Sequence, residues 1–138
     1  TPTIHGDRIF ALGATGILNA LDAATGRRVW SVNIGTDTST KVPMWGFASS
    51  PLVQGDVVIV AAAGKLVAYD LATGVLRWRG PVRPGGYTSP HRLTVAGQTQ
   101  VMLMHADGAV AVDPVSGAVL WEHAWDLGAP IVQPAVLP

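Results

Sequence analysis

The sequence predicts an all-β fold assembled from repeated units, and three observations support this prediction. First, an eleven-residue pattern occurs three times, at Ala20–Trp30, Ala68–Trp78 and Ala111–Trp121. Self-similarity at such a spacing is typical of repeat architectures. Second, short apolar runs rich in β-branched residues alternate with turns that contain Gly, Asp or Pro. Third, no stretch of the chain shows the apolar periodicity that predicts a helix.

Each copy of the pattern places four residue types at fixed distances from one another. The Asp ends an apolar run and stands at the head of a short turn, where its carboxylate can accept backbone N–H bonds. The Gly closes that turn in a left-handed backbone conformation. The Trp follows in the next strand, where its ring can cover a neighbouring unit. The predicted structural residues are Ala20, Asp22, Gly26, Trp30, Ala68, Asp70, Gly74, Trp78, Ala111, Asp113, Gly117 and Trp121.

The three motif aspartates have an alternative interpretation as the ligands of a metal ion. We do not favour it, because each acid serves an identical turn and the turns would lie one unit apart. The four histidines include no pair at the short spacing of a metal site. The chain also has no Cys, which excludes disulfides and thiolate ligands. The sequence thus predicts no metal, cofactor-binding or catalytic residue.

Each repeat is predicted to contain four antiparallel strands, A to D. The second strands are expected at Arg8–Leu12, Val57–Ala62 and Gln100–Met104. The run Val57–Ala62 is apolar on both faces, which is typical of a sheet packed between two other sheets. Repeat 1 is expected over about 1–35, a connecting loop over 36–48, repeat 2 over 49–80 and repeat 3 over 88–125. Residues 131–138 are expected to begin a fourth repeat, with Ile131–Leu137 as its A strand.

Composition narrows the range of partners. Nine Lys and Arg residues balance nine Asp and Glu residues, so the chain carries no electrostatic footprint for nucleic acid or an anionic membrane surface. No stretch approaches the ~20 consecutive apolar residues needed to span a bilayer. The chain begins with Thr1 rather than Met. We therefore expect that its natural start is missing, through processing or because a longer chain is represented in part.

The eleven-residue pattern resembles the tryptophan-docking motif of the pyrroloquinoline quinone (PQQ)-like β-propeller family. The resemblance covers nearly the whole chain. It implies four-stranded blades arranged in a ring, in which the Trp of one blade packs on the motif of the next. It also implies an extracytoplasmic, periplasmic location by analogy. The family contains quinoprotein dehydrogenases and a non-catalytic, BamB-like branch, and we favour the second.

Three complete blades and an extra A strand cannot close a ring, because propellers close with typically four to eight blades. We expect either additional blades in a longer protein or association of several copies of this chain. An open end would expose apolar blade faces and unpaired strand edges, which promote association. The expected partners are therefore a protein or copies of the chain itself, as a homo-oligomer.

The links between repeats differ most and are the expected place for function. The first link ends in Met44, Trp45 and Phe47, while Tyr87 and Trp125 occupy the other two links. Exposed Met and aromatic residues are favoured at interaction surfaces. These five residues form the candidate interaction surface. The alternative is that they pack over the blade tops or the ring channel.

A PQQ-dependent alcohol or sugar dehydrogenase would be expected, from the resemblance, to supply a catalytic Asp and Ca²⁺ ligands that include Glu and Asn. The chain has one Glu, Glu122, and two Asn, Asn19 and Asn33, none of which is predicted to belong to an assembled site. We therefore predict a non-catalytic scaffold for protein–protein interaction or self-assembly. The alternative is a fragment of such a dehydrogenase whose PQQ and Ca²⁺ site lies outside this chain.

Overall fold

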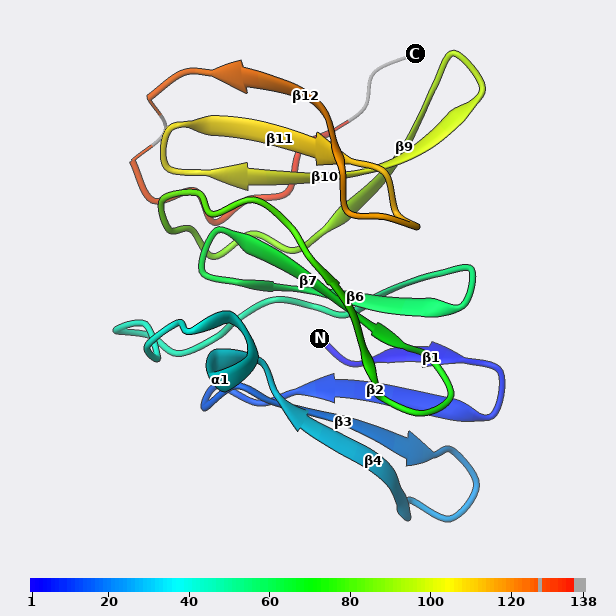
Figure 1. Cartoon of the computed structure of the whole chain (residues 1–138). Helices are drawn as coiled ribbons and strands as arrows, with labels where there is room; N and C mark the ends of the chain where they lie inside the picture. The colour runs from blue at the N-terminus through cyan, green and yellow to red at the C-terminus, as the bar shows by residue number, and fades with distance from the viewer. Residues whose placement is uncertain (127, 136–138) are drawn as a thin grey trace.

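The computed structural model describes residues 1–126 and 128–135, which fold into three four-stranded antiparallel sheets (Figure 1). Each sheet follows the order of the chain and is called a blade. The all-β prediction and the prediction of four strands per repeat are confirmed. Blade 1 contains β1 (Thr3–His5), β2 (Arg8–Leu12), β3 (Ile17–Asp22) and β4 (Arg28–Asn33). Blade 2 contains β5 (Leu52–Gln54), β6 (Val57–Ala62), β7 (Lys65–Asp70) and β8 (Leu76–Arg79). Blade 3 contains β9 (His91–Val95), β10 (Gln98–His105), β11 (Gly108–Val112) and β12 (Val119–Ala124).

The three blades stack face to face, with blade 2 in the middle (Figure 1). Strand β6 is buried along its whole length. Its residues Val58 and Val60 join the core shared with blade 1, while Val57 and Ile59 join the core shared with blade 3. This is the arrangement that its doubly apolar sequence predicts, because both faces of a middle sheet must exclude water.

The two ends of the stack carry different connections. One end, which we call the loop face, carries the turns 13–16, 63–64 and 106–107 and the links that leave β4, β8 and β12. The opposite end, the turn face, carries the motif turns between β3 and β4, β7 and β8, and β11 and β12. The irregular connections between blades therefore begin at the loop face.

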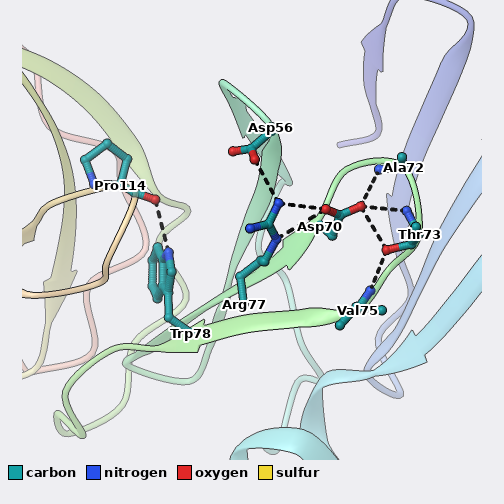
Figure 2. A network of polar contacts seen from close by, with 8 residues as sticks. All are labelled: Asp56, Asp70, Ala72, Thr73, Val75, Arg77, Trp78 and Pro114. Atoms are coloured by element: carbon teal, nitrogen blue, oxygen red, sulfur yellow. Dashed lines mark hydrogen bonds and ion pairs between the residues drawn. The ribbon is translucent and has the colours of Figure 1, made fainter.

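The motif turns are built in the same way in all three blades. In blade 2, Oδ1 of Asp70 accepts hydrogen bonds from the backbone N–H of Ala72 at 3.0 Å and of Thr73 at 2.9 Å (Figure 2). The Thr73 hydroxyl donates to the same oxygen at 2.8 Å. The same three donors engage the other two motif aspartates, from Ala24 and Thr25 in blade 1 and from Val115 and Ser116 in blade 3.

These hydrogen bonds lower the pKa of each motif aspartate. The Thr73 hydroxyl and backbone N–H, assisted by the Arg77 guanidinium, lower the pKa of Asp70 to about 2. The pKa of Asp22 is lowered chiefly by the Thr25 hydroxyl and N–H, and that of Asp113 chiefly by the Ser116 N–H. Each carboxylate is thus occupied by its own turn. The three do not converge on a common point, as a metal site would require.

The motif tryptophans connect each blade to the next. The Trp30 ring lies against Gly74 of the blade 2 turn, and its Nε1 donates to the carbonyl of Leu71 at 3.2 Å. The Trp78 ring lies in the same way against Gly117 of blade 3, and its Nε1 donates to the carbonyl of Pro114 at 3.0 Å (Figure 2). Both rings are nearly buried.

The turn of the first copy and the tryptophan of the third copy are left without a counterpart among the described residues. No atom lies within 4 Å of the position that a Cβ would take on Gly26 of blade 1. At the other end of the stack, Nε1 of Trp121 donates to Oε1 of Gln100 in its own sheet at 2.6 Å. Blade 1 therefore presents a free receiving turn, and blade 3 presents a Trp that packs on no other turn of this part of the chain.

The link from blade 1 to blade 2 contains a short helix, α1 (Ile34–Thr38), which the sequence did not predict. Oδ1 of Asn33 caps its start by accepting the N–H of Thr36 at 3.1 Å, and Ser39 ends it with φ of 52°. A five-residue helix is too short to show apolar periodicity, and local capping defines it instead.

Side chains of blade 2 hold α1 in place. The Tyr69 hydroxyl donates to Oδ2 of Asp37 at 2.8 Å, and Nζ of Lys65 donates to the carbonyl of Thr38 at 3.2 Å. Arg79 donates to the backbone carbonyl of Asp37. Burial, together with the neighbouring Asp37 carboxylate, raises the pKa of the Tyr69 hydroxyl. The neutral phenol therefore remains a donor, and the link is attached to a rigid sheet.

The expectation that Phe47 belongs to an interaction surface is wrong, because its side chain is only 4% exposed. It joins the core between blades 1 and 2. A Cβ on Gly16 would lie 2.9 Å from the Phe47 ring, so glycine at this position allows the ring to enter. The backbone N–H of Phe47 donates to the carbonyl of Ala14 at 2.9 Å. Phe47 is thus an apolar anchor for the link.

The predicted fourth A strand, Ile131–Leu137, is not formed over 131–135, and its remaining residues lie outside the described part of the chain. A side chain makes the contact instead. Oε1 of Gln133 accepts the N–H of Ser89 at 3.1 Å, and its Nε2 donates to the Ser89 carbonyl at 3.0 Å. Within the described residues, no helix has the length and apolar character needed to cross a membrane.

Replacing Gly74 by Ala should destabilise the fold more than replacing Gly26 by Ala. The two glycines close the same kind of turn with φ of 74° and 71°, so either new side chain introduces similar backbone strain, about 1 kcal/mol. Only at position 74 would the Cβ also collide with Trp30, at 2.7 Å. Overpacking of that kind adds about 1–3 kcal/mol. Urea unfolding of both variants measures the difference, and equal losses would contradict the importance of the contact.

Candidate functional site

The exposed aromatic surface of the chain lies on the loop face. Met44 is 87% exposed and Trp45 is 69% exposed. Both residues precede the buried Phe47, with Gly46 between, in a turn where the N–H of Gly46 donates to the carbonyl of Pro43 at 2.9 Å. Because the anchor and the turn fix the backbone on the C-terminal side, the two side chains are directed away from the core.

Trp45 does not stand alone, because it contacts the aromatic residue of the second link. The ring centroids of Trp45 and Tyr87 are 5.3 Å apart, and the ring planes are tilted by 52°. Aromatic pairs at this separation attract one another beyond the effect of buried area. The Tyr87 backbone is itself held, since its N–H donates to the carbonyl of Pro130 at 2.8 Å. Residues 42 positions apart therefore form one surface.

A pocket of about 230 Å³ opens beside this pair. We call it the Tyr87 pocket, and its walls come from the links and from the turns of blades 2 and 3. Most of its lining consists of small residues and backbone, so its shape is set by the course of the chain. The lining includes Pro43, Ala63, Gly86, Tyr87, Ala106 and Ala129.

Trp125, the third aromatic residue of the predicted surface, makes a different contact. Its ring centroid is 5.2 Å from that of His123 on β12. Its backbone N–H donates to the carbonyl of Asp107 in the turn between β10 and β11 at 3.1 Å. The structure therefore brings Met44, Trp45 and Tyr87 together, assigns Phe47 to the core, and places Trp125 beside a separate group of polar residues.

That polar group was not predicted from the sequence. Arg83, His105, Asp107, Glu122 and His123 line one pocket of about 220 Å³ on the loop face of blade 3. The residues come from a link, a strand end, a turn and another strand, so their spacing along the chain carries no signal. The one signal in the sequence was the position of His105, which directly follows the predicted strand Gln100–Met104. In the structure it is the last residue of β10, next to the turn that leads to β11.

The described residues do not fit the donor set expected for PQQ with Ca²⁺. The carboxylate of Glu122 forms an ion pair with Arg83, and the amide oxygen of Asn33 caps α1. Calcium requires six to eight oxygen ligands. Across residues 1–126 and 128–135, no three His, Asp or Glu side chains lie close enough together to hold a metal ion.

Known proteins resemble this chain in sequence and in structure. The outer membrane protein assembly factor BamB of Burkholderia pseudomallei is 26% identical over 156 residues, which cover 88% of this chain and 41% of that protein. The quinohemoprotein alcohol dehydrogenase ADH IIB of Pseudomonas putida is 32% identical over 95 residues, which cover 64% of this chain and 13% of that protein. The chain therefore spans less than half the length of these relatives.

The crystal structure of BamB from Moraxella catarrhalis shares the arrangement of blades. Its TM-score is 0.64 at 26% sequence identity, and the match covers 86% of this chain and 34% of that one. A family model described as outer membrane protein assembly factor BamB matches residues 1–130. Because this match extends over nearly all of the sequence, the chain belongs to the PQQ-like β-propeller family that this model describes.

Proposed function

We propose that this chain is a non-catalytic propeller segment that binds a protein partner on its loop face. One observation carries the proposal: Met44 and Trp45 are exposed while Trp45 is held against Tyr87. Exposed Met and Trp side chains are typical of the few residues that dominate binding energy, and here they stand next to the half-buried Tyr87, which lines a pocket. The relatives named as assembly factors support a role in protein interaction.

The surface is preorganised, which favours binding. The buried Phe47 and the turn at Gly46 fix one side of the link, and the bonds from Tyr69 and Lys65 fix the other. Binding to a surface that is already ordered loses less conformational entropy than binding to a flexible loop. The proposal therefore requires little rearrangement of the links.

We also propose that the three repeated motifs act as tryptophan-docking motifs that join this segment to further blades. The supporting contacts are those of Trp30 with Gly74 and of Trp78 with Gly117. By the same geometry, the free turn at Gly26 would receive a Trp from another blade. Those blades belong to a longer protein or to a second copy of this chain.

The loop-face proposal predicts cross-links from position 44. A photoreactive benzophenone residue placed there, in the organism that makes the chain, should attach to a discrete protein partner. The same residue at Val115 is the matched control, because this position is also highly exposed but lies on the turn face. The variant Trp45→Ala should lower the yield from position 44 about tenfold or more, because exposed Trp is a frequent source of binding energy. Equal cross-linking from both positions would contradict the proposal.

Light scattering across a concentration series tests whether copies of the chain join through Gly26. We expect the mass of the unmodified chain to rise to a defined oligomer. In Gly26→Ala the new Cβ would meet an incoming Trp as a Cβ on Gly74 would meet Trp30, and the association should weaken about tenfold. A monomer at every concentration would instead assign the missing blades to a longer chain. An unchanged oligomer in the variant would place the contact elsewhere.

A second candidate function, part of a PQQ-dependent dehydrogenase, is favoured by the 32% identity to a quinohemoprotein alcohol dehydrogenase. Equilibrium dialysis with PQQ and Ca²⁺ tests whether a cofactor site lies within this chain. Under the scaffold proposal, the folded chain should retain no more PQQ than the urea-unfolded chain does. Retention that is saturable and depends on Ca²⁺ would favour the dehydrogenase and count against a purely structural role.

A further inference from the structure

The polar pocket on blade 3, which we call the His105 pocket, contains a buried polar group that none of the described residues satisfies. The side chain of His105 is nearly inaccessible, with 5% of the residue exposed. Its Nδ1 has no hydrogen-bond partner among the described residues. Buried polar atoms are nearly always bonded, and an exception calls for an explanation in the native structure.

The walls of this pocket are fixed by bonds between separate elements. The N–H of Ala106 donates to the carbonyl of Gly85 at 2.9 Å, and the N–H of Trp125 donates to the carbonyl of Asp107 at 3.1 Å. Arg83 from the second link forms an ion pair with Glu122 on β12. The segments that line the pocket are thus held in place by contacts that do not involve the His105 side chain.

The charges around the pocket select the kind of ligand. One arginine and two carboxylates line it, which gives a formal charge of −1 with neutral histidines. Glu122 is already paired with Arg83, whereas no cation among the described residues pairs with Asp107. Burial and the nearby Arg83 lower the pKa of His105, although Asp107 opposes them. The imidazole is therefore neutral and keeps one ring nitrogen as an acceptor.

A group that suits these surroundings is positively charged and carries several N–H donors. A primary ammonium has three donors on a compact charge, and a lysine side chain presents it on a slender apolar stem. A pocket of about 220 Å³ accommodates such a group. An anionic ligand would instead meet two carboxylates and an arginine that is already paired.

We infer that the His105 pocket receives the ammonium group of a lysine side chain from the partner protein, with the carboxylate of Asp107 as its acceptor and His105 in the pocket wall. This inference rests on the proposed binding of a partner to the loop face. The two pockets adjoin, because Gly85 and Ala106 line the Tyr87 pocket and are bonded to each other between Arg83 and His105. A partner segment across the loop face can therefore place an apolar side chain beside Trp45 and a lysine in the His105 pocket.

The test follows the ring signals of His105 by NMR while N-acetyl-L-lysine N-methylamide is added to the whole chain. We expect a saturable shift of the His105 signals. The neutral analogue N-acetyl-L-norleucine N-methylamide should cause no such shift. The variant Asp107→Asn should weaken binding of the lysine analogue about tenfold or more, because it removes a charge-assisted hydrogen bond. The matched control Asp126→Asn makes the same charge change outside the pocket and should leave the titration unchanged.

The inference would be overturned if the His105 signal did not shift, or if it shifted equally with both analogues. It would also be overturned if Asp107→Asn left the titration with the lysine analogue unchanged. Cross-linking from position 44 keeps this result separate from the proposed function. If that cross-link forms and Asp107→Asn weakens it several-fold, the lysine belongs to the partner. If the cross-link forms but does not respond to Asp107→Asn, the inference fails and the proposed function stands. If the lysine analogue binds without any cross-link, the pocket takes a free amine and the proposed partner is wrong.

Discussion

The contact between a tryptophan ring and a glycine turn holds this stack of blades in register. The rings of Trp30 and Trp78 lie where a Cβ on Gly74 or Gly117 would intrude, and each indole N–H reaches a carbonyl of the same turn. Glycine is required twice over, for the left-handed backbone and for the close approach. The aspartate at the head of the turn stabilises the conformation that the ring contacts. Neighbouring sheets are thereby fixed in position as well as packed by apolar area.

A scaffold fixed in this way leaves the links free to differ. The first link is long enough to include α1, and its side chains are bonded to blade 2 before Phe47 returns to the core. This course brings Trp45 to Tyr87, a residue of the following link. The sheets form a rigid scaffold and the links carry the residues that we propose for binding, a division common in proteins whose loops carry function.

Polar side chains on the loop face differ from those on the turn face in how fully they are hydrogen-bonded. On the turn face, the motif aspartates are satisfied within their own turns, and exposed ion pairs such as Arg8 with Asp7 contribute little stability. On the loop face, His105 is buried and its Nδ1 has no hydrogen-bond partner among the described residues, and Asp107 next to it forms no ion pair with them. An unsatisfied buried group costs stability. The group lies close to the pair formed by Trp45 and Tyr87, where we propose that a partner binds.

The sequence by itself determined the all-β class, the strand order within each blade and the residues of the motif turns, because these depend on local patterns that repeat. It also placed Met44, Trp45 and Tyr87 in the irregular links. Only the tertiary structure decided that Phe47 belongs to the core, since its burial depends on Gly16 in a distant turn. Only the tertiary structure brought together Arg83, the pair His105 and Asp107, and Glu122, which lie on three separate segments. Contacts between segments depend on how the blades stack, and no local spacing encodes them.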